Sequence, residues 1–160
     1  MSDFDYKQLQ KYLENLDNID KDFEVFLKQF LLEMAQRVVR KAKLKTPVDT
    51  GALRNSYVIG SGERVLKATR GKSKSGKQKV TRDLSKSTVE DIKIIGNTME
   101  VTIGNEMEYA SFQEYGYPLR NGQWKQGHFM LTMAVDEIQK QIPKRFEKQF
   151  LQFIKNKGVG

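Results

Sequence analysis

Few residues in this 160-residue chain have a type and a position that could support catalysis. His128 is the single histidine, and it could serve as a general base if Glu114 or Asp136 oriented its ring. A lone histidine beside the start of a helix is more often structural. Glu106 and Glu108 could contribute to a divalent-cation site, but alternating acids on a loop are usually solvated. We therefore predict a protein that is not an enzyme and that uses no metal and no cofactor.

A second possible site is the glycine-rich segment that begins at Gly71. Gly71 and Gly76 have the spacing of a phosphate-binding loop, and Lys77 follows them. Gln78 stands where that loop requires serine or threonine, and no long helix follows. The sequence therefore does not predict a nucleotide site.

The densest cluster of backbone-controlling residues runs from Thr46 to Ser56, Thr-Pro-Val-Asp-Thr-Gly-Ala-Leu-Arg-Asn-Ser. Pro47 fixes its own φ and disfavours a helical Thr46, so a preceding helix should end there. Asp49 or Thr50 would cap a short helical turn that has Gly51 and Ala52 in its first positions. Arg54 would project from this turn as its one long cation. The pattern predicts a rigid corner with a charged tip, and it also fits a plain helix-to-strand connector.

Hydrophobic periodicity predicts two helices before this corner. Residues 4–16 indicate a short helix, residues 17–20 indicate a break, and Asp20 would cap the next helix. A second helix is expected over about residues 21–45, with one apolar stripe as its core face. The stripe consists of Phe23, Phe26, Leu27, Phe30, Leu31, Met34, Val38 and Ala42.

After the corner, short strands are expected at 57–59, 89–95 and 99–103, with a hairpin turn at Gly96-Asn97. Residues 109–115 indicate a short helix and 116–127 a loop. A last helix over about 129–155 should be kinked or split by Pro143. This order predicts an α+β fold, in which a small antiparallel β-sheet packs against two long α-helices. We expect a single domain, 1–160, with residues 1–19 as a helical extension.

The chain has no cysteine, which fits a reducing compartment and removes disulfides and thiolate metal sites. The polar, acidic N-terminus lacks the apolar segment of a signal peptide. No segment approaches the length of a membrane span. We therefore expect a soluble cytosolic protein with no membrane partner.

Nearly all of the net charge of +8 lies between residues 61 and 87. Low apolar content and a glycine- and serine-rich tip predict a long flexible basic arm over 63–87, either a loop or a mobile β-hairpin. The arm could contact DNA phosphates without reading sequence, dock on an acidic partner, or remain a solvated loop. Its basic residues are Arg64, Lys67, Arg70, Lys72, Lys74, Lys77, Lys79, Arg82 and Lys86.

A second block of residues follows the corner in order, namely Tyr109-Ala110, Glu114-Tyr115-Gly116 and Phe129-Met130. Together with Thr46–Ser56, this block resembles the tail-completion, or neck, proteins of long-tailed bacteriophages, a group related to the minor tail protein Z family. The resemblance covers roughly residues 20–156. The chain departs from the family pattern at Gly116-Tyr117 and His128-Phe129, where relatives often have Gly-Thr and Pro-Phe, and its arm is longer and more basic.

The resemblance implies a structural, non-enzymatic protein at the head–tail junction of a phage or prophage. Such proteins form rings, which need heterologous contacts that close by rotation. The order of the ring stays open, with a hexamer as one candidate. The implied partners are further copies of the chain, the connector, and the tail terminator or tube, with non-specific contact between the arm and packaged DNA. The protein would assemble in the host cytoplasm and remain in the virion.

On this hypothesis, the corner and the second block supply the contacts between proteins. Arg54 of one copy could face Glu114 of the next as an exposed pair, worth about 0–1 kcal/mol. Tyr109 and Tyr115 are stronger anchors, because aromatic residues dominate interface hot spots, whereas Phe112 is expected in the core. The corner candidates are Thr46, Pro47, Asp49, Thr50, Gly51, Leu53 and Arg54, and the interface candidates are Tyr109, Glu114, Tyr115, Gly116, Phe129 and Met130.

The alternative function is a stand-alone nucleic-acid-binding domain that uses residues 63–87 as its contact surface. Such a domain would hold DNA at physiological salt, whereas an assembly protein would show only weak, salt-labile contact. The arm has no interleaved aromatic residues, so base stacking on it is not expected.

Overall fold

The computed structural model describes residues 6–49, 51–60, 66–72, 78–82 and 88–157. Its longest element is α1 (Tyr6–Lys45), a helix of 40 residues. The predicted break at 17–20 is wrong, because the helix runs through it without interruption. Asp17, Asn18 and Asp20 are exposed there. Polar residues on the solvent side of a helix cost only a few tenths of a kcal/mol each, and no proline or glycine interrupts this stretch.

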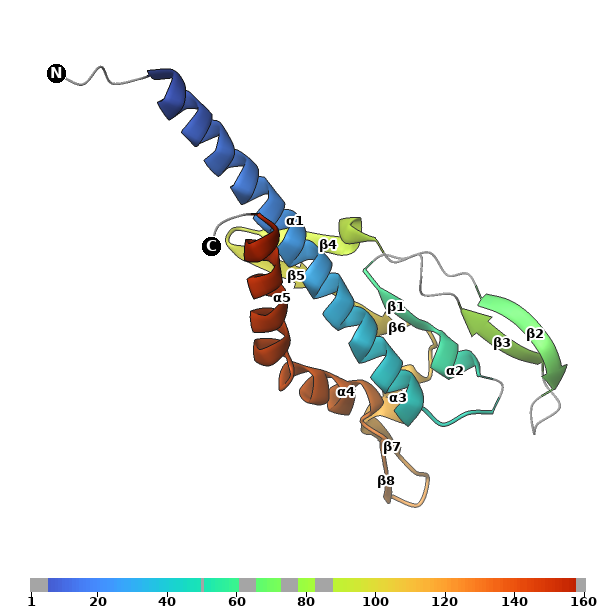
Figure 1. Ribbon diagram of the computed structural model, residues 1–160. Helices are drawn as coiled ribbons and strands as arrows, with labels where there is room; N and C mark the ends of the chain where they lie inside the picture. The colour runs from blue at the N-terminus through green and yellow to red at the C-terminus, as the bar shows by residue number, and fades with distance from the viewer. Residues whose placement is uncertain (1–5, 50, 61–65, 73–77, 83–87, 158–160) are drawn as a thin grey trace.

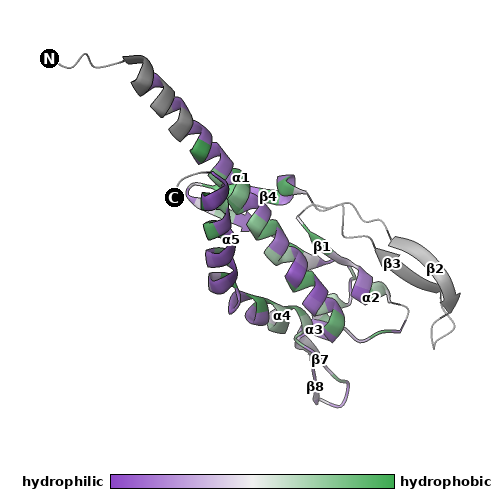
Figure 2. Ribbon diagram, viewed as in Figure 1, coloured by the Kyte–Doolittle hydropathy of each residue, from purple (hydrophilic) through white to green (hydrophobic). Residues whose placement is uncertain are grey.

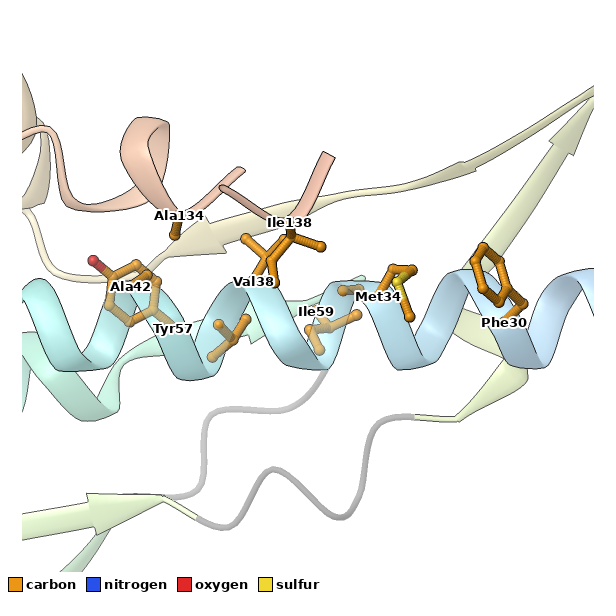
Figure 3. Packing of buried hydrophobic residues seen from close by; sticks show 10 residues of the cluster. Phe30, Met34, Val38, Ala42, Tyr57, Ile59, Ala134 and Ile138 are labelled. Atoms are coloured by element: carbon orange, nitrogen blue, oxygen red, sulfur yellow. The ribbon is translucent and has the colours of Figure 1, made fainter. Parts of the chain in front are cut away.

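The core lies where the second half of α1 meets β1 (Tyr57–Ile59) and α4 (Met130–Gln139). Figure 3 shows Met34, Val38 and Ala42 of α1 in this cluster together with Tyr57 and Ile138. Val39, Ala42 and Ala134 are fully buried. The prediction that the apolar stripe of α1 forms the core is therefore confirmed over its second half.

The last helix is split as predicted, into α4 and α5 (Ile142–Asn156), with Pro143 in the first turn of α5. Proline is tolerated there because the first turn of a helix lacks intrahelical N–H partners. Aromatic rings join α5 to α1, and the ring centroids of Phe26 and Phe153 lie 4.9 Å apart. Figure 2 shows hydrophobic and hydrophilic positions alternating along the described part of α1 and along α5. The cluster consists of Phe23, Phe26, Phe30, Phe146, Phe150 and Phe153.

The strands form four separate two-stranded antiparallel pairs, rather than the one small sheet that the sequence predicted. β1 pairs with β6 (Ile103–Asn105), β4 (Ile92–Ile95) with β5 (Thr98–Val101), β2 (Leu66–Lys72) with β3 (Gln78–Arg82), and β7 (Gly116–Pro118) with β8 (Trp124–Gln126). Gly60, with φ 65°, ends β1 after three residues, so β1 does not extend along β5. The α+β class is confirmed, and the hairpin at Gly96-Asn97 joins β4 to β5 as predicted.

Two local predictions need correction. The expected strand at 89–95 begins with a 3₁₀ turn, η1 (Val89–Asp91), because Thr88 and Asp91 form a reciprocal capping box. The expected loop at 116–127 contains the β7–β8 hairpin, whose tip is held by hydrogen bonds between Leu119 and Gln123 and within Asn121-Gly122-Gln123. Figure 1 shows this hairpin projecting from the body beside α3 (Ala110–Tyr115).

Of the two forms left open for the basic arm, the described residues have the hairpin, β2–β3. Lys67, Arg70 and Lys72 lie on β2, and Lys79 and Arg82 lie on β3. Arg64, Lys74, Lys77 and Lys86 lie outside the described residues.

Candidate assembly surface

The corner after α1 is held by its own hydrogen bonds. α1 ends at Lys45 as predicted, and the hydroxyl of the buried Thr46 donates to the Ala42 carbonyl oxygen at 2.7 Å. The Thr46 and Tyr57 hydroxyl oxygens are 3.1 Å apart. Burial raises the pKa of Tyr57, and the charge of Glu114 adds to this shift, so the phenol stays protonated as a hydrogen-bonding group.

The short helical turn after the corner is α2 (Ala52–Asn55), and its N-cap differs from the prediction. Gly51, with φ 84°, is the N-cap residue of this turn, in place of the predicted Asp49 or Thr50. A left-handed residue at this position favours glycine, which explains the choice at 51. Thr50, the other predicted cap, lies outside the described residues.

The corner is also tied to the end of β6, across about fifty residues of sequence. The Asn105 side-chain amide donates to the Leu53 carbonyl oxygen at 2.8 Å. The Glu106 backbone N–H donates to the Ser56 carbonyl oxygen at 3.1 Å, and the Ser56 hydroxyl donates back to Ala52 at 2.7 Å. Leu53 and Ser56 are buried. These bonds make the corner a fixed part of the fold.

Glu114 has a structural role that the sequence did not reveal. It is buried, with 7% of its surface exposed, and its carboxylate caps the start of α4. One carboxylate oxygen accepts from the Leu131 N–H at 3.0 Å, and the other accepts from the N–H and the hydroxyl of Thr132 at 2.9 and 2.8 Å. The N-cap residue itself, Phe129, has φ 48° and provides no side-chain cap. Glu114 therefore supplies from α3 the acceptor that α4 lacks locally.

Two glycines allow the chain segments beside Glu114 to approach closely. Gly116 has φ 90°, and a Cβ at this position would lie 2.2 Å from the Lys125 carbonyl oxygen. A Cβ at Gly127 would lie 2.2 Å from the Glu114 carbonyl oxygen. Backbone N–H groups of His128 and Phe129 donate to Gln113 and Glu114. The blocks Glu114-Tyr115-Gly116 and Phe129-Met130 thus form one packed unit.

This unit displays aromatic side chains to solvent. The exposed fractions are 54% for Phe112, 61% for Tyr115 and 63% for Trp124, with Tyr109 at 41%. The ring of Tyr117 contacts Phe112 edge-on, and the Lys125 ammonium lies 5.6 Å from the Tyr117 ring centre. The residues Phe112, Tyr115, Tyr117 and Trp124, on α3 and the β7–β8 hairpin, are called the aromatic surface below.

The predicted interface residues divide into exposed and buried ones. Tyr109 and Tyr115 are exposed, whereas Glu114, Gly116 and Met130 are buried in the chain itself. An exposed Arg54–Glu114 pair between copies is therefore wrong, because both Glu114 oxygens are already bonded inside the fold. Phe112, expected in the core, is on the surface. Trp124 was missed, although a single tryptophan in a short glycine-bounded segment beside Tyr117 was a usable signal.

A shallow groove separates the corner from α3. Its volume is about 400 Å³, and its lining includes Val48, Asp49, Ala52, Tyr109 and Gln113. Burial raises the pKa of Tyr109, and the charge of Asp49 raises it further. The predicted corner and the first of the predicted interface aromatics thus meet in space.

The catalytic arrangements considered from the sequence are not assembled here. His128 is exposed, and the Glu114 carboxylate bonds Leu131 and Thr132 instead of the imidazole. The described residues contain no group of three or more histidine, cysteine or acidic side chains that could hold a metal ion. Within the same part of the chain, no helix is both long and apolar enough to cross a membrane.

The fold and the surface define a small α+β protein with an exposed aromatic region beside a fixed corner. The chain belongs to the HK97-gp10-like family, described as "Bacteriophage HK97-gp10, putative tail-component", and the match covers residues 7–116. The resemblance to phage neck and tail proteins is confirmed at this level. Membership supports a structural phage protein of the virion that contacts other phage structural proteins. No curated protein and no solved structure matches the chain.

Glu114→Ala should destabilise the fold by about 1–2 kcal/mol, because it leaves two partly buried N–H groups at the start of α4 without their acceptor. Glu108→Ala, at an exposed acid close in sequence, is the matched control and should change stability by less than about 0.5 kcal/mol. Urea unfolding followed by circular dichroism measures both. Equal effects of the two variants would contradict the capping role.

Gly116→Ala and Gly122→Ala separate backbone strain from steric overlap. Both glycines have positive φ, but a Cβ at Gly122 meets nothing within 4 Å. We expect Gly122→Ala to cost about 1–2 kcal/mol from its left-handed backbone alone, and Gly116→Ala to cost at least about 2 kcal/mol more. Thermal melts of the two variants test the difference, and similar melting temperatures would refute the close approach.

Proposed function

We propose that this chain is a non-enzymatic structural protein that joins head and tail in a phage or prophage. The observation that carries the proposal is the aromatic surface, because Tyr115 and Trp124 are more than half exposed on a segment fixed by Glu114 and Gly116. Large exposed aromatic side chains on a fixed backbone are typical of protein interfaces. Family membership supports a partner within the virion.

A ring is the arrangement that this surface supports best at a junction between a head and a tubular tail. A ring requires two different patches on each copy, which meet as each copy contacts the next. The aromatic surface supplies one patch, and the groove between the corner and α3 is close enough to contribute to a second. We propose further copies of the chain, the connector, and the tail terminator or tube as partners, with a hexamer as the candidate order. Assembly would take place in the host cytoplasm.

Tyr115→Ala and Trp124→Ala should prevent joining without unfolding the protein. Each variant removes an exposed anchor, for which a loss of 2 kcal/mol or more in binding is typical of a hot spot. Complementation of a phage that lacks the gene measures infectious titre, and electron microscopy counts free heads and free tails. Leu151→Ala, at a residue of α5 that is also more than half exposed, is the control. Normal titres with both aromatic variants, or normal joining without the chain, would refute the proposal.

We propose that the basic arm contacts packaged DNA through phosphates. The nine basic residues between 61 and 87 support this contact, and the low net charge of the remaining chain makes the arm the main source of the excess positive charge. Replacing these nine residues with serine should weaken DNA binding and flatten its salt dependence, measured by fluorescence anisotropy. Replacing the lysines with arginine is the control, which should retain binding. Unchanged affinity in the serine variant would leave an acidic protein as the partner of the arm.

A further inference from the structure

The two halves of α1 carry opposite charge. Residues 6–25 contain five acidic residues and three lysines, whereas residues 26–45 contain six basic residues and one acidic residue. Figure 1 shows the N-terminal end of α1 extending past α5, away from the rest of the fold, whereas Phe23 of the same half packs against Phe150 and Phe153 of α5. Glu14, Asp17 and Asp20 are exposed in this half and make no ion pair with any residue that the structure describes.

The same half of α1 is amphipathic in sequence. Leu9, Tyr12, Leu16 and Ile19 follow one another at steps of three, four and three residues. This spacing places the four positions on one stripe of a helix, as in a coiled-coil seam. An acidic helix with an apolar stripe is a suitable ligand for a groove that has an apolar floor and a basic rim.

A groove of this kind lies at the other end of the helix, between α1 and the α4–α5 junction. Its volume is about 340 Å³, and its rim carries Arg37, Arg40, Lys41 and Arg145. Leu44, which is 74% exposed, and Ile138 supply apolar surface. These residues are called the basic groove below.

The acids beside the basic groove are already satisfied. Glu33 bonds Arg37 at 2.7 Å and accepts from Gln149, and Glu137 bonds Lys41 at 3.0 Å and Lys45. Burial alone would raise the pKa of Glu33, but bonds from Gln149 and Arg37 outweigh it and lower that pKa. Hydrogen bonds from Lys45 and Lys41 lower the pKa of Glu137. Both acids are therefore ionised and paired at neutral pH.

Two of the rim cations make no close ion pair with a described acid, although the charge of Arg145 also helps to lower the pKa of Glu33. Arg40 is exposed and makes no ion pair with any described residue. Arg145 donates to the neutral side chain of Gln141, with both N···O distances 3.2 Å. Among the described residues, the basic groove therefore has unpaired positive charge on Arg40. The N-terminal half of α1 has unpaired negative charge on Glu14, Asp17 and Asp20.

We propose that the acidic N-terminal half of α1 of one copy docks in the basic groove of the next copy, head to tail. The contact must be between copies, because residues 17 and 40 of one straight helix lie roughly 35 Å apart at 1.5 Å per residue. It joins two different surfaces, so it is heterologous and can close into a ring. The inference rests on the proposed self-assembly and adds a further pair of contact surfaces to the aromatic surface and the groove beside the corner.

A charge-swap experiment tests this contact on the full chain. Arg40→Glu and Asp17→Arg should each weaken self-association at least about fivefold, because each replaces an attraction by a repulsion. The two variants mixed together, or both changes in one chain, should recover association to within about twofold of the original chain, since the charges are again complementary. Lys93→Glu, an equal charge change on exposed β4, is the control and should have no effect. Sedimentation equilibrium at low salt measures all of these chains.

Cross-linking gives a second readout that does not depend on charge. The chain has no cysteine, so Asn18→Cys and Leu44→Cys introduce the only thiols. Within one copy these positions lie roughly 39 Å apart along α1, beyond the reach of a short bis-maleimide. We expect a ladder of covalent oligomers from the chain with both cysteines, and no ladder from either single-cysteine chain or after adding Arg40→Glu.

The outcomes separate this inference from the proposed function. A chain that stays monomeric at all accessible concentrations, or Arg40→Glu with unchanged self-association, would overturn head-to-tail docking. Binding of a neighbouring neck protein in the basic groove, instead of a second copy of the chain, would also overturn head-to-tail docking. Normal head–tail joining in particles that lack the chain would refute the proposed function, even if purified copies associate through the basic groove.

Discussion

The buried Glu114 carboxylate is the contact on which the exposed surface depends. A buried charge is costly unless it is hydrogen-bonded, and here two backbone N–H groups and one hydroxyl surround it at the start of α4. α4 in turn places Ala134 and Ile138 in the core against α1. A single side chain therefore couples α3, which displays aromatic residues, to the helix layer that holds the fold together. An interface built on α3 is therefore held in position by contacts with that core.

Three consecutive residues of this region have three different physical roles. Glu114 is buried and caps a helix, Tyr115 is exposed, and Gly116 allows a backbone approach that no Cβ would fit. Together they explain why an acid, an aromatic residue and a glycine occur side by side. The matched family range ends at Gly116, whereas the N–H groups that Glu114 caps belong to residues 131 and 132. The acid–aromatic–glycine pattern therefore shows only one partner of this contact, because the other partner is the backbone N–H groups of α4.

Patterns carried by side chains were predicted well from the sequence. The stripe through Met34, Val38 and Ala42, the turn at Gly96-Asn97 and the split at Pro143 depend on spacing or on intrinsic backbone preference. Contacts between a side chain and a backbone segment distant in sequence were not predicted, because an N–H group has no signature in a sequence. The cap from Glu114 to α4 belongs to this class. The break expected at Asp17–Asp20 failed for a related reason, since four polar-rich residues are compatible with a helix that continues on both sides.

The length of α1 has a consequence for assembly. A 40-residue helix spans roughly 60 Å at 1.5 Å per residue, so it holds its two charged halves at a fixed separation. Isolated helices shorter than about 12–15 residues are marginal in water, because nucleation is costly. The projecting half avoids that cost, since the packed half supplies the nucleus and each added residue only propagates the helix. A groove of opposite charge on a neighbouring copy would add packing to this half of the helix. The core of one copy thus presents a preformed ligand to the next, and less conformational entropy is lost on docking than if the segment folded there.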